Sequence, residues 1–266
     1  PFTQLADIRA YYEIAGSGPR LLTISGTGGD LRKRPNVFDS PLSEHFEILA
    51  YDQRGLGQTE RPDIPYTMQD YADDAARLLD AVGWPSALVM GTSFGGMVAQ
   101  EFALRHPQRV AKLVLACTSS GGAGGSSYPL HELGHLTPAE RFRYTAPISD
   151  TRCTAEWQAE HAAEFQAMLD FTLAQMQIGA DEPNRAIGAR RQLEARMGHD
   201  TFERLPQLAM PVFICGGRYD GIAPAANQEA LLAQIPHATM ELFEGGHGFL
   251  MQDPLAYERV IAFLLA

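Results

Sequence analysis

The chain has 266 residues, 45% of them hydrophobic and 20% charged, which is typical of a globular protein with a sizeable core and excludes a disordered chain. Its 32 acidic and 21 basic residues give a formal charge of −11, which argues against a nucleic-acid partner because phosphate backbones are bound by basic faces. The three cysteines, Cys117, Cys153 and Cys215, are widely spaced and show neither a disulfide framework nor a Cys-x-x-Cys metal pattern.

Neither a signal peptide nor a membrane span is visible in the sequence. Residues 1–10 lack the basic start and the apolar core of a signal peptide. No apolar run approaches the roughly 18 residues that a membrane-spanning helix needs. We therefore expect a soluble, cytoplasmic protein without a membrane partner, present as a monomer or a homodimer.

Six short apolar runs predict the strands of a mostly parallel sheet. They are rich in Val, Ile and Leu and do not alternate with polar residues, which is typical of strands buried on both faces. Before them, residues 2–13 predict an antiparallel hairpin or an edge strand. The six runs lie at residues 21–24, 46–51, 87–90, 112–117, 212–215 and 240–243.

Helical patterns separate these runs. Thr67 and Asp70 predict an N-cap with a first-turn acid, and Gly83 predicts the end of that helix. A second helix is expected over residues 97–105, and a third begins at Pro224. Strands that alternate with helices predict an α/β fold with a doubly wound, mostly parallel sheet.

One long stretch, residues 119–209, holds no strand-like run. It begins with a Gly- and Ser-rich run that we expect to be flexible, and residues 154–176 and 182–197 predict helices. This pattern predicts a helical lid inserted between two strands, over the strand C-termini where open α/β sheets bind ligands. The core is then expected to consist of residues 1–118 and 210–266.

The strongest local motif is Gly91-Thr92-Ser93-Phe94-Gly95, which lies between a predicted strand and a predicted helix. A nucleophile at such a sharp turn needs a strained backbone, so its close neighbours must be nearly free of side chains. The N-terminus of the following helix favours developing negative charge. Ser93 is therefore the predicted nucleophile, and an ordinary glycine turn is the alternative.

A serine hydroxyl is a weak nucleophile and needs a base that is held by a carboxylate. Asp220 follows the predicted strand at residues 212–215, and His247 follows the one at 240–243. Both residues are thus expected at the same edge of the sheet as Ser93. The alternatives are that Asp220 caps a helix and that His247 is an ordinary loop histidine.

Two backbone N–H groups are candidates for an oxyanion hole. One belongs to Phe94, the residue after the nucleophile. The other belongs to Thr27, in the turn Ser25-Gly26-Thr27-Gly28-Gly29 that follows the first apolar run. A plain glycine turn is the alternative, and a phosphate-binding loop is disfavoured because no Gly-Lys-Ser/Thr follows.

These motifs resemble the α/β-hydrolase superfamily, in its group of Ser-nucleophile esterases, enol-lactonases and C–C hydrolases. The resemblance covers residues 21–120 and 210–266, and the candidate residues follow the family's chain order Ser, Asp, His. It includes Asp52-Gln53-Arg54-Gly55-Leu56-Gly57, which is similar to the family's Asp-x-Arg-Gly-x-Gly turn. The chain departs from the family at Ser25, where histidine is usual. Its serine nucleophile disfavours haloalkane dehalogenase and epoxide hydrolase activity, which use aspartate.

The resemblance implies a serine hydrolase that cleaves a small to medium carboxylic ester or lactone through an acyl-enzyme, with Ser93, His247 and Asp220 as a triad and with no cofactor or metal. One alternative is hydrolysis of a C–C bond in a ring-cleavage diketone. Relatives with that activity often carry an aromatic residue just after the catalytic histidine, where this chain has Gly248. Another alternative is a ligand-binding receptor that keeps the triad but turns over slowly.

Three further patterns have simpler interpretations. The run His131-Glu132-Leu133-Gly134-His135 matches a zinc-protease motif, but that motif needs a helix, and its glycine and a preceding proline favour a loop leading into the lid. The basic runs 32–34 and 190–191 could receive an anionic substrate, and we interpret them as solvated faces. Apolar residues within 168–176 either pack on the core or line an acyl pocket.

Overall fold

In the computed structural model, which describes residues 1–266, eight strands form one sheet in the order β1-β2-β4-β3-β5-β6-β7-β8. β1 pairs with β2, and β2 with β4, in antiparallel fashion, whereas all the other pairs are parallel. This is the doubly wound, mostly parallel sheet that the sequence predicts. The strands are β1 (Phe2–Leu5), β2 (Ile8–Gly16), β3 (Arg20–Ile24), β4 (Glu47–Tyr51), β5 (Ala87–Thr92), β6 (Val110–Ala116), β7 (Val212–Gly217) and β8 (Ala238–Phe243).

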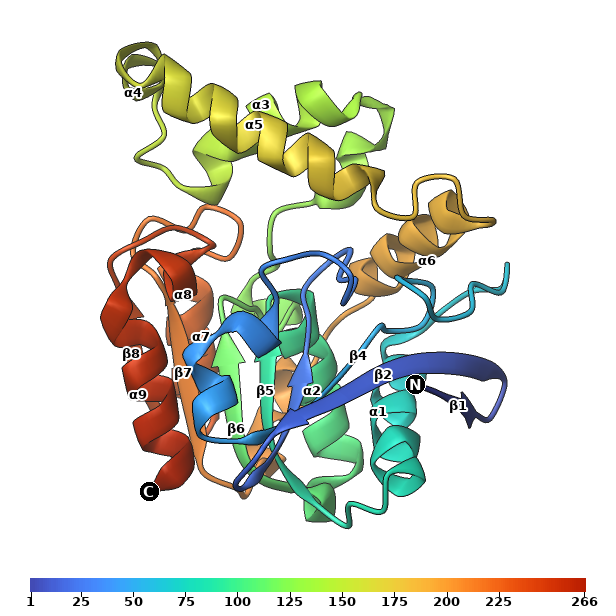
Figure 1. Cartoon of the computed structure of the whole chain (residues 1–266). Coiled ribbons are helices and arrows are strands. Elements are labelled where there is room, and N and C mark those ends of the chain that lie inside the picture. Colours follow the sequence, from blue (N-terminus) through green and yellow to red (C-terminus); the bar gives the residue numbers. More distant parts are fainter.

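Helices cover both faces of the sheet, as Figure 1 shows. α1 (Met68–Ala81), α2 (Phe94–Arg105) and α7 (Ala225–Gln234) contribute to the hydrophobic cluster on one face. α8 (Phe249–Gln252) and α9 (Pro254–Leu265) contribute to the cluster on the other face. Because both faces are buried, the central strands are mostly apolar, and their charged residues, Arg20, Glu47 and Lys112, lie near the strand N-termini.

The helices between β6 and β7 lie above the end of the sheet toward which the parallel strands run (Figure 1). They are α3 (Pro138–Ser149), α4 (Ala155–Glu160), α5 (Ala162–Gln177) and α6 (Arg185–Met197). None of the helices combines the length and the apolarity needed to span a bilayer. We call the segment from α3 to α6 the lid helices.

Three expectations about this region were wrong in detail. The helix predicted over 154–176 is two helices, because His161 leaves the helical conformation and its ring stacks on Trp157 at 4.6 Å. α6 begins at Arg185 rather than at residue 182, after Asn184 in a left-handed conformation. The zinc-protease-like run forms a 3₁₀ helix, Leu130–His135, rather than a loop.

The Gly- and Ser-rich run after β6 packs into the fold more closely than its composition indicates. Ser119 and Ser120 are buried, and the Ser120 carbonyl accepts a hydrogen bond from the Thr201 N–H at 2.8 Å. Gly121 forms an isolated β-bridge with Asp200. The run is therefore tied to the chain that returns from the lid helices to β7.

A buried ion-pair network supports the turn after β4. The Arg54 guanidinium donates to both carboxylate oxygens of Asp74, at 2.9 and 3.0 Å, and to both of Asp7, at 2.7 and 2.8 Å. Arg54 and Asp74 are 3% and 1% exposed. Burial raises the pKa of Asp74 to about 6, and the charge of Arg54 works against that rise.

Replacing Arg54 by methionine should destabilise the fold by about 3 kcal/mol, because the buried Asp74 carboxylate would keep only the half-exposed Arg77, 3.5 Å away, as a charged partner. The double variant Arg54→Met/Asp74→Leu should recover most of this loss, since it removes the poorly paired carboxylate as well. Urea unfolding with a common m-value measures both effects. A single-variant loss below about 1 kcal/mol would show that the pair is not a buried one.

Candidate active site

The turn that carries Ser93 is strained. β5 ends directly before Ser93, whose φ of 56° and ψ of −118° lie outside the regions that residues with side chains normally adopt. A Cβ added to Gly91 would lie 2.3 Å from the Gly95 carbonyl oxygen, and one added to Gly95 would lie 2.0 Å from that of Ile24. The two glycines thus permit the close approach that the sharp turn requires, and α2 begins at Phe94, earlier than predicted.

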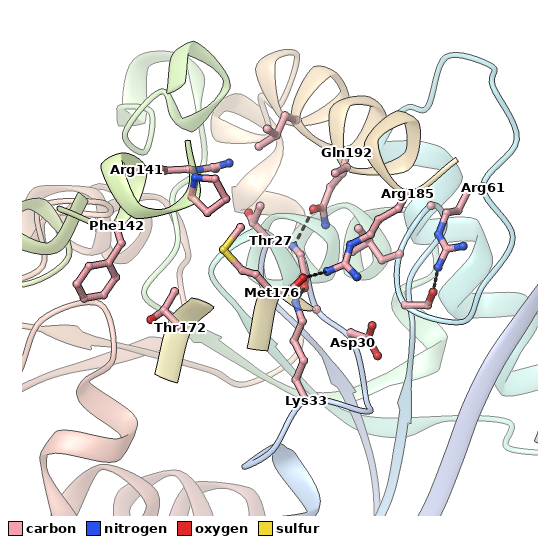
Figure 2. Close-up of a pocket in the computed structure, with 18 of the residues that line it drawn as sticks. Thr27, Asp30, Lys33, Arg61, Arg141, Phe142, Thr172, Met176, Arg185 and Gln192 are labelled. Atoms are coloured by element: carbon pink, nitrogen blue, oxygen red, sulfur yellow. Dashed lines mark hydrogen bonds between the residues drawn. The ribbon is translucent and has the colours of Figure 1, made fainter. Parts of the chain in front are cut away.

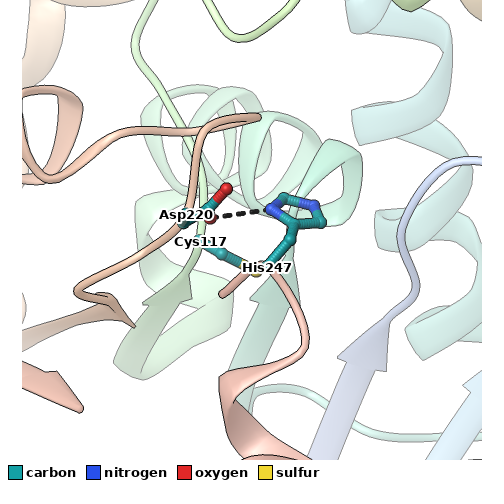
Figure 3. A group of neighbouring side chains, drawn as sticks. All are labelled: Cys117, Asp220 and His247. Carbon is teal, nitrogen blue, oxygen red and sulfur yellow. Dashed lines mark hydrogen bonds and ion pairs between the residues drawn. The ribbon is translucent and has the colours of Figure 1, made fainter. Parts of the chain in front are cut away.

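Ser93, His247 and Asp220 form one row of hydrogen bonds. His247 Nε2 is 2.9 Å from Ser93 Oγ, and His247 Nδ1 is 2.8 Å from Asp220 Oδ2, the contact drawn in Figure 3. A carboxylate can only accept, so the imidazole proton lies on Nδ1, and Nε2 is left to accept the Ser93 hydroxyl proton. This geometry would allow the Ser93 hydroxyl proton to pass to a histidine that Asp220 orients.

The Asp220 carboxylate is fixed by its own loop after β7. Its Oδ1 accepts the N–H groups of Ile222 and Ala223 at 2.8 and 2.9 Å, which leaves Oδ2 for His247. The end of α3 is attached to the same region: the Gly221 N–H donates to the Ile148 carbonyl, and the His247 N–H donates to that of Ser149. A lid helix thus contacts the loops that carry Asp220 and His247.

Cys117 lies beside this pair, with its sulfur and the nearest Asp220 and His247 atoms all within 4.8 Å of one another (Figure 3). Burial and the charge of Asp220 raise the pKa of the Cys117 thiol well above its usual range, so the sulfur stays protonated. A metal would need the thiolate and a free imidazole nitrogen, but both His247 nitrogens are hydrogen-bonded. The arrangement favours the hydrogen-bonded row over a metal centre.

The two expected oxyanion donors lie on elements that meet at Ser93. The Thr27 N–H has no hydrogen-bond partner. Phe94 is the first residue of α2, where backbone N–H groups have no partner inside the helix. The loop of Thr27 lies against Ser93, since a Cβ added to Gly26 would be 3.4 Å from Ser93 Cβ.

Two glutamines that the sequence analysis missed hold this loop. Gln53 Nε2 donates to the Ser25 carbonyl at 2.7 Å and to Ser25 Oγ at 3.2 Å. On the other side, the Gly28 N–H donates to Gln192 Oε1 of α6 at 2.9 Å. Gln53 thus supports the loop at Ser25, the position where the family resemblance implies a histidine. Its place in the Asp-x-Arg-Gly-x-Gly turn was the sequence signal that could have indicated this role.

Two cavities border the loop that carries Thr27. One of about 670 Å³ is lined by Gly26, Thr92 and His247, among others. The other, of about 360 Å³, lies between Thr27 and the lid helices and is shown in Figure 2. Met176, from the predicted apolar lid face, lines this second cavity, whereas Leu169 is buried and Phe171 is exposed.

Most of the basic residues that we interpreted as solvated faces are paired with carboxylates. Arg32 pairs with Asp30 and Glu182, and Arg34 with Asp39. Arg190 and Arg191 pair with Asp63. Lys33 differs, because its ammonium group lies in the cavity beside Thr27 and donates to the Gly28 carbonyl.

The histidine that follows α6 makes the fold sensitive to acid. His199 is 7% exposed, its Nε2 is bonded to the Ser119 carbonyl, and burial lowers its pKa to about 4. Since the unfolded chain takes up this proton first, near pH 6.5, the contribution of His199 to the free energy of unfolding should fall by about 2 kcal/mol between pH 7 and pH 5. His199→Gln should lack this part of the loss, and the exposed-site variant His237→Gln should retain it. Equal pH dependence in all three proteins, by urea unfolding, would contradict the assignment.

The chain is similar to known hydrolases along most of its length. The chain is 29% identical over 241 residues to the poly(3-hydroxyalkanoate) depolymerase of Ectopseudomonas oleovorans, covering 91% of this chain and 82% of that one. It is 25% identical over 220 residues to 3-oxoadipate enol-lactonase 2 of Acinetobacter baylyi, covering 83% and 79%. The crystal structure of an enol-lactonase from Burkholderia xenovorans shares the fold, with a TM-score of 0.79 at 22% identity over 100% of this chain and 99% of that one.

The profile of the alpha/beta hydrolase fold matches residues 19–254, which include the strands from β3 to β8 and all the lid helices. The match covers most of the chain, and the structural neighbour has the same architecture. The chain therefore belongs to the α/β-hydrolase fold family and is a hydrolase.

Proposed function

We propose that the protein is a serine hydrolase that cleaves a small or medium carboxylic ester or lactone through an acyl-enzyme. The observation that carries this proposal is the row of Ser93, His247 and Asp220, joined at 2.9 and 2.8 Å on a strained turn. One relative is named as a lactonase, which supports the same class of substrate. The cavities of about 360 and 670 Å³ have the size of small-molecule sites.

In the proposed mechanism, Ser93 Oγ attacks the carbonyl carbon while His247 Nε2 takes the hydroxyl proton. Asp220 orients the imidazole and stabilises the imidazolium. The N–H groups of Thr27 and Phe94 hold the oxyanion. His247 then gives its proton to the leaving alcohol, and water repeats the sequence on the acyl-enzyme to release the acid. These residues supply every group that the reaction needs.

Pre-steady-state hydrolysis of 4-nitrophenyl butyrate tests the proposal, with a pH-stat assay of δ-valerolactone beside it. We expect a burst of nitrophenol as the acyl-enzyme forms, followed by turnover of about one per second or faster. A single stoichiometric release without turnover would instead support a slow-turnover receptor. Cleavage of a ring-cleavage diketone with no ester or lactone turnover would support the C–C hydrolase.

A further inference from the structure

The cavity of about 360 Å³ beside Thr27 is positively charged, although the whole chain has a formal charge of −11. Four basic side chains and one acidic side chain line it: Lys33, Arg61, Arg141, Arg185 and Asp30. The acid is neutralised by Arg32, and Arg61 is neutralised by Glu182. The excess positive charge therefore comes from Lys33, Arg141 and Arg185.

Arginine pairing in the rest of the chain makes this excess unusual. Three buried or half-buried arginines have no carboxylate within ion-pair distance, and all three belong to the lid helices: Arg141, Arg185 and Arg196. Every other buried or half-buried arginine is paired, namely Arg32, Arg54, Arg61, Arg109, Arg191 and Arg204. Leaving a desolvated charge unpaired costs free energy, so the lid helices keep these groups at the expense of stability.

Arg141 has the most available donors of the group. It extends from α3 into the cavity, half-buried, and its guanidinium makes no hydrogen bond or ion pair with the chain, whereas Arg185 is bonded to the carbonyls of Met176 and Ile178. Burial lowers the pKa of Arg141, and burial and the nearby Arg141 charge lower that of Arg196 to about 10. The positive charges of Arg141 and Arg196 therefore repel each other.

Lys33 faces the same space from the opposite side. Figure 2 shows Arg141 entering from the lid helix and Lys33 reaching up from the loop, with Thr27 and Met176 near the middle. The Lys33 ammonium has one acceptor, the Gly28 carbonyl at 2.9 Å, and two further N–H donors. Arg141 and Lys33 therefore present free N–H donors to the same cavity from opposite sides.

We propose that this cavity binds a free carboxylate carried by the substrate, held by Arg141 with Lys33, so that the preferred substrates are monoesters of dicarboxylic acids or lactones that bear a carboxylate. The planar guanidinium fork matches a carboxylate in a bidentate manner. The cavity shares Thr27 with the expected oxyanion hole, so the anion and the reacting carbonyl would belong to one molecule. This inference rests on the proposed function for its reaction, but its anion site is tested separately below.

The activity test compares two substrates that differ by one charge: mono-4-nitrophenyl pimelate and the same ester capped as its methyl ester. The wild type should show a higher kcat/KM for the charged ester. In Arg141→Met this preference should fall by about 10- to 100-fold, mainly through KM, and Arg141→Lys should keep part of it. Arg143→Met, which removes an exposed arginine from the same helix, should leave the preference unchanged.

A binding test needs no turnover. Calorimetric titration of Ser93→Ala with pimelate should show binding that weakens with salt and is lost in Ser93→Ala/Arg141→Met. Hydrolysis of both esters with no charge preference and no pimelate binding would overturn the anion site and leave the hydrolase proposal intact. Binding of pimelate through Arg141 without hydrolysis of either ester would support the anion site and contradict the hydrolase proposal.

Discussion

Ser93→Ala should lower kcat for ester hydrolysis by about 10⁶-fold, because His247 would then have no hydroxyl to activate and no acyl-enzyme could form. The oxyanion donors and the cavities would remain, so a residual rate above that in water is expected. The change is small in structural terms: Ser93 Oγ contacts His247 Nε2, and the backbone bonds of the turn do not involve it.

The measurement is steady-state turnover of 4-nitrophenyl butyrate, with near-UV circular dichroism and a thermal melt to show that the variant is folded. Ser43→Ala, in a 3₁₀ helix outside the site, is the matched control and should keep wild-type activity. Residual activity above about 1% of wild type in a folded Ser93→Ala protein would mean that another group is the nucleophile.

Asp220→Asn should lower kcat by about 10⁴-fold without disturbing the fold. The asparagine carbonyl can still accept the N–H groups of Ile222 and Ala223, as Oδ1 does in the wild type at 2.8 and 2.9 Å. Its amide group would then face His247 Nδ1 and donate to it, which forces the proton onto Nε2. The imidazole would be held in place in the tautomer that cannot accept from Ser93.

This variant separates orientation of the histidine from its presence. We expect Asp220→Asn to keep a thermal stability close to that of the wild type while kcat falls steeply. The exposed-site variant Asp181→Asn should change neither the thermal stability nor kcat. A loss smaller than about tenfold would indicate that Asp220 acts only as a loop cap, the alternative that its sequence position leaves open.

The sheet could be predicted because its signal is local. Each central strand is an apolar run, and α1 has the reciprocal N-cap of Thr67 and Asp70 that the sequence predicts. The lid helices were harder, since nothing in the periodicity of residues 154–176 marks the interruption at His161. The burial of Ser119 and Ser120 depends on contacts with residues about 80 positions away, which composition does not encode.

In the site, too, the residues with a local sequence signal could be predicted, and those that depend on distant contacts could not. Ser93, Asp220 and His247 each follow a strand, so the topology alone brings them to one edge of the sheet. Gln192 supports the loop of Thr27 from a helix that is remote in sequence. Arg141 belongs to no sequence motif. Its proposed role in anion binding depends on its lack of a carboxylate partner, which only the packed structure determines.

The most direct test of the proposed function is the intact mass of the protein after treatment with a small fluorophosphonate, which reacts with an activated serine. We expect one adduct on the wild type, no adduct on Ser93→Ala, and slow labelling of Asp220→Asn. Peptide mapping should place the adduct on Ser93. A folded wild-type protein that remains unlabelled, or that is labelled equally after Ser93→Ala, would contradict the assignment of Ser93 as an activated nucleophile.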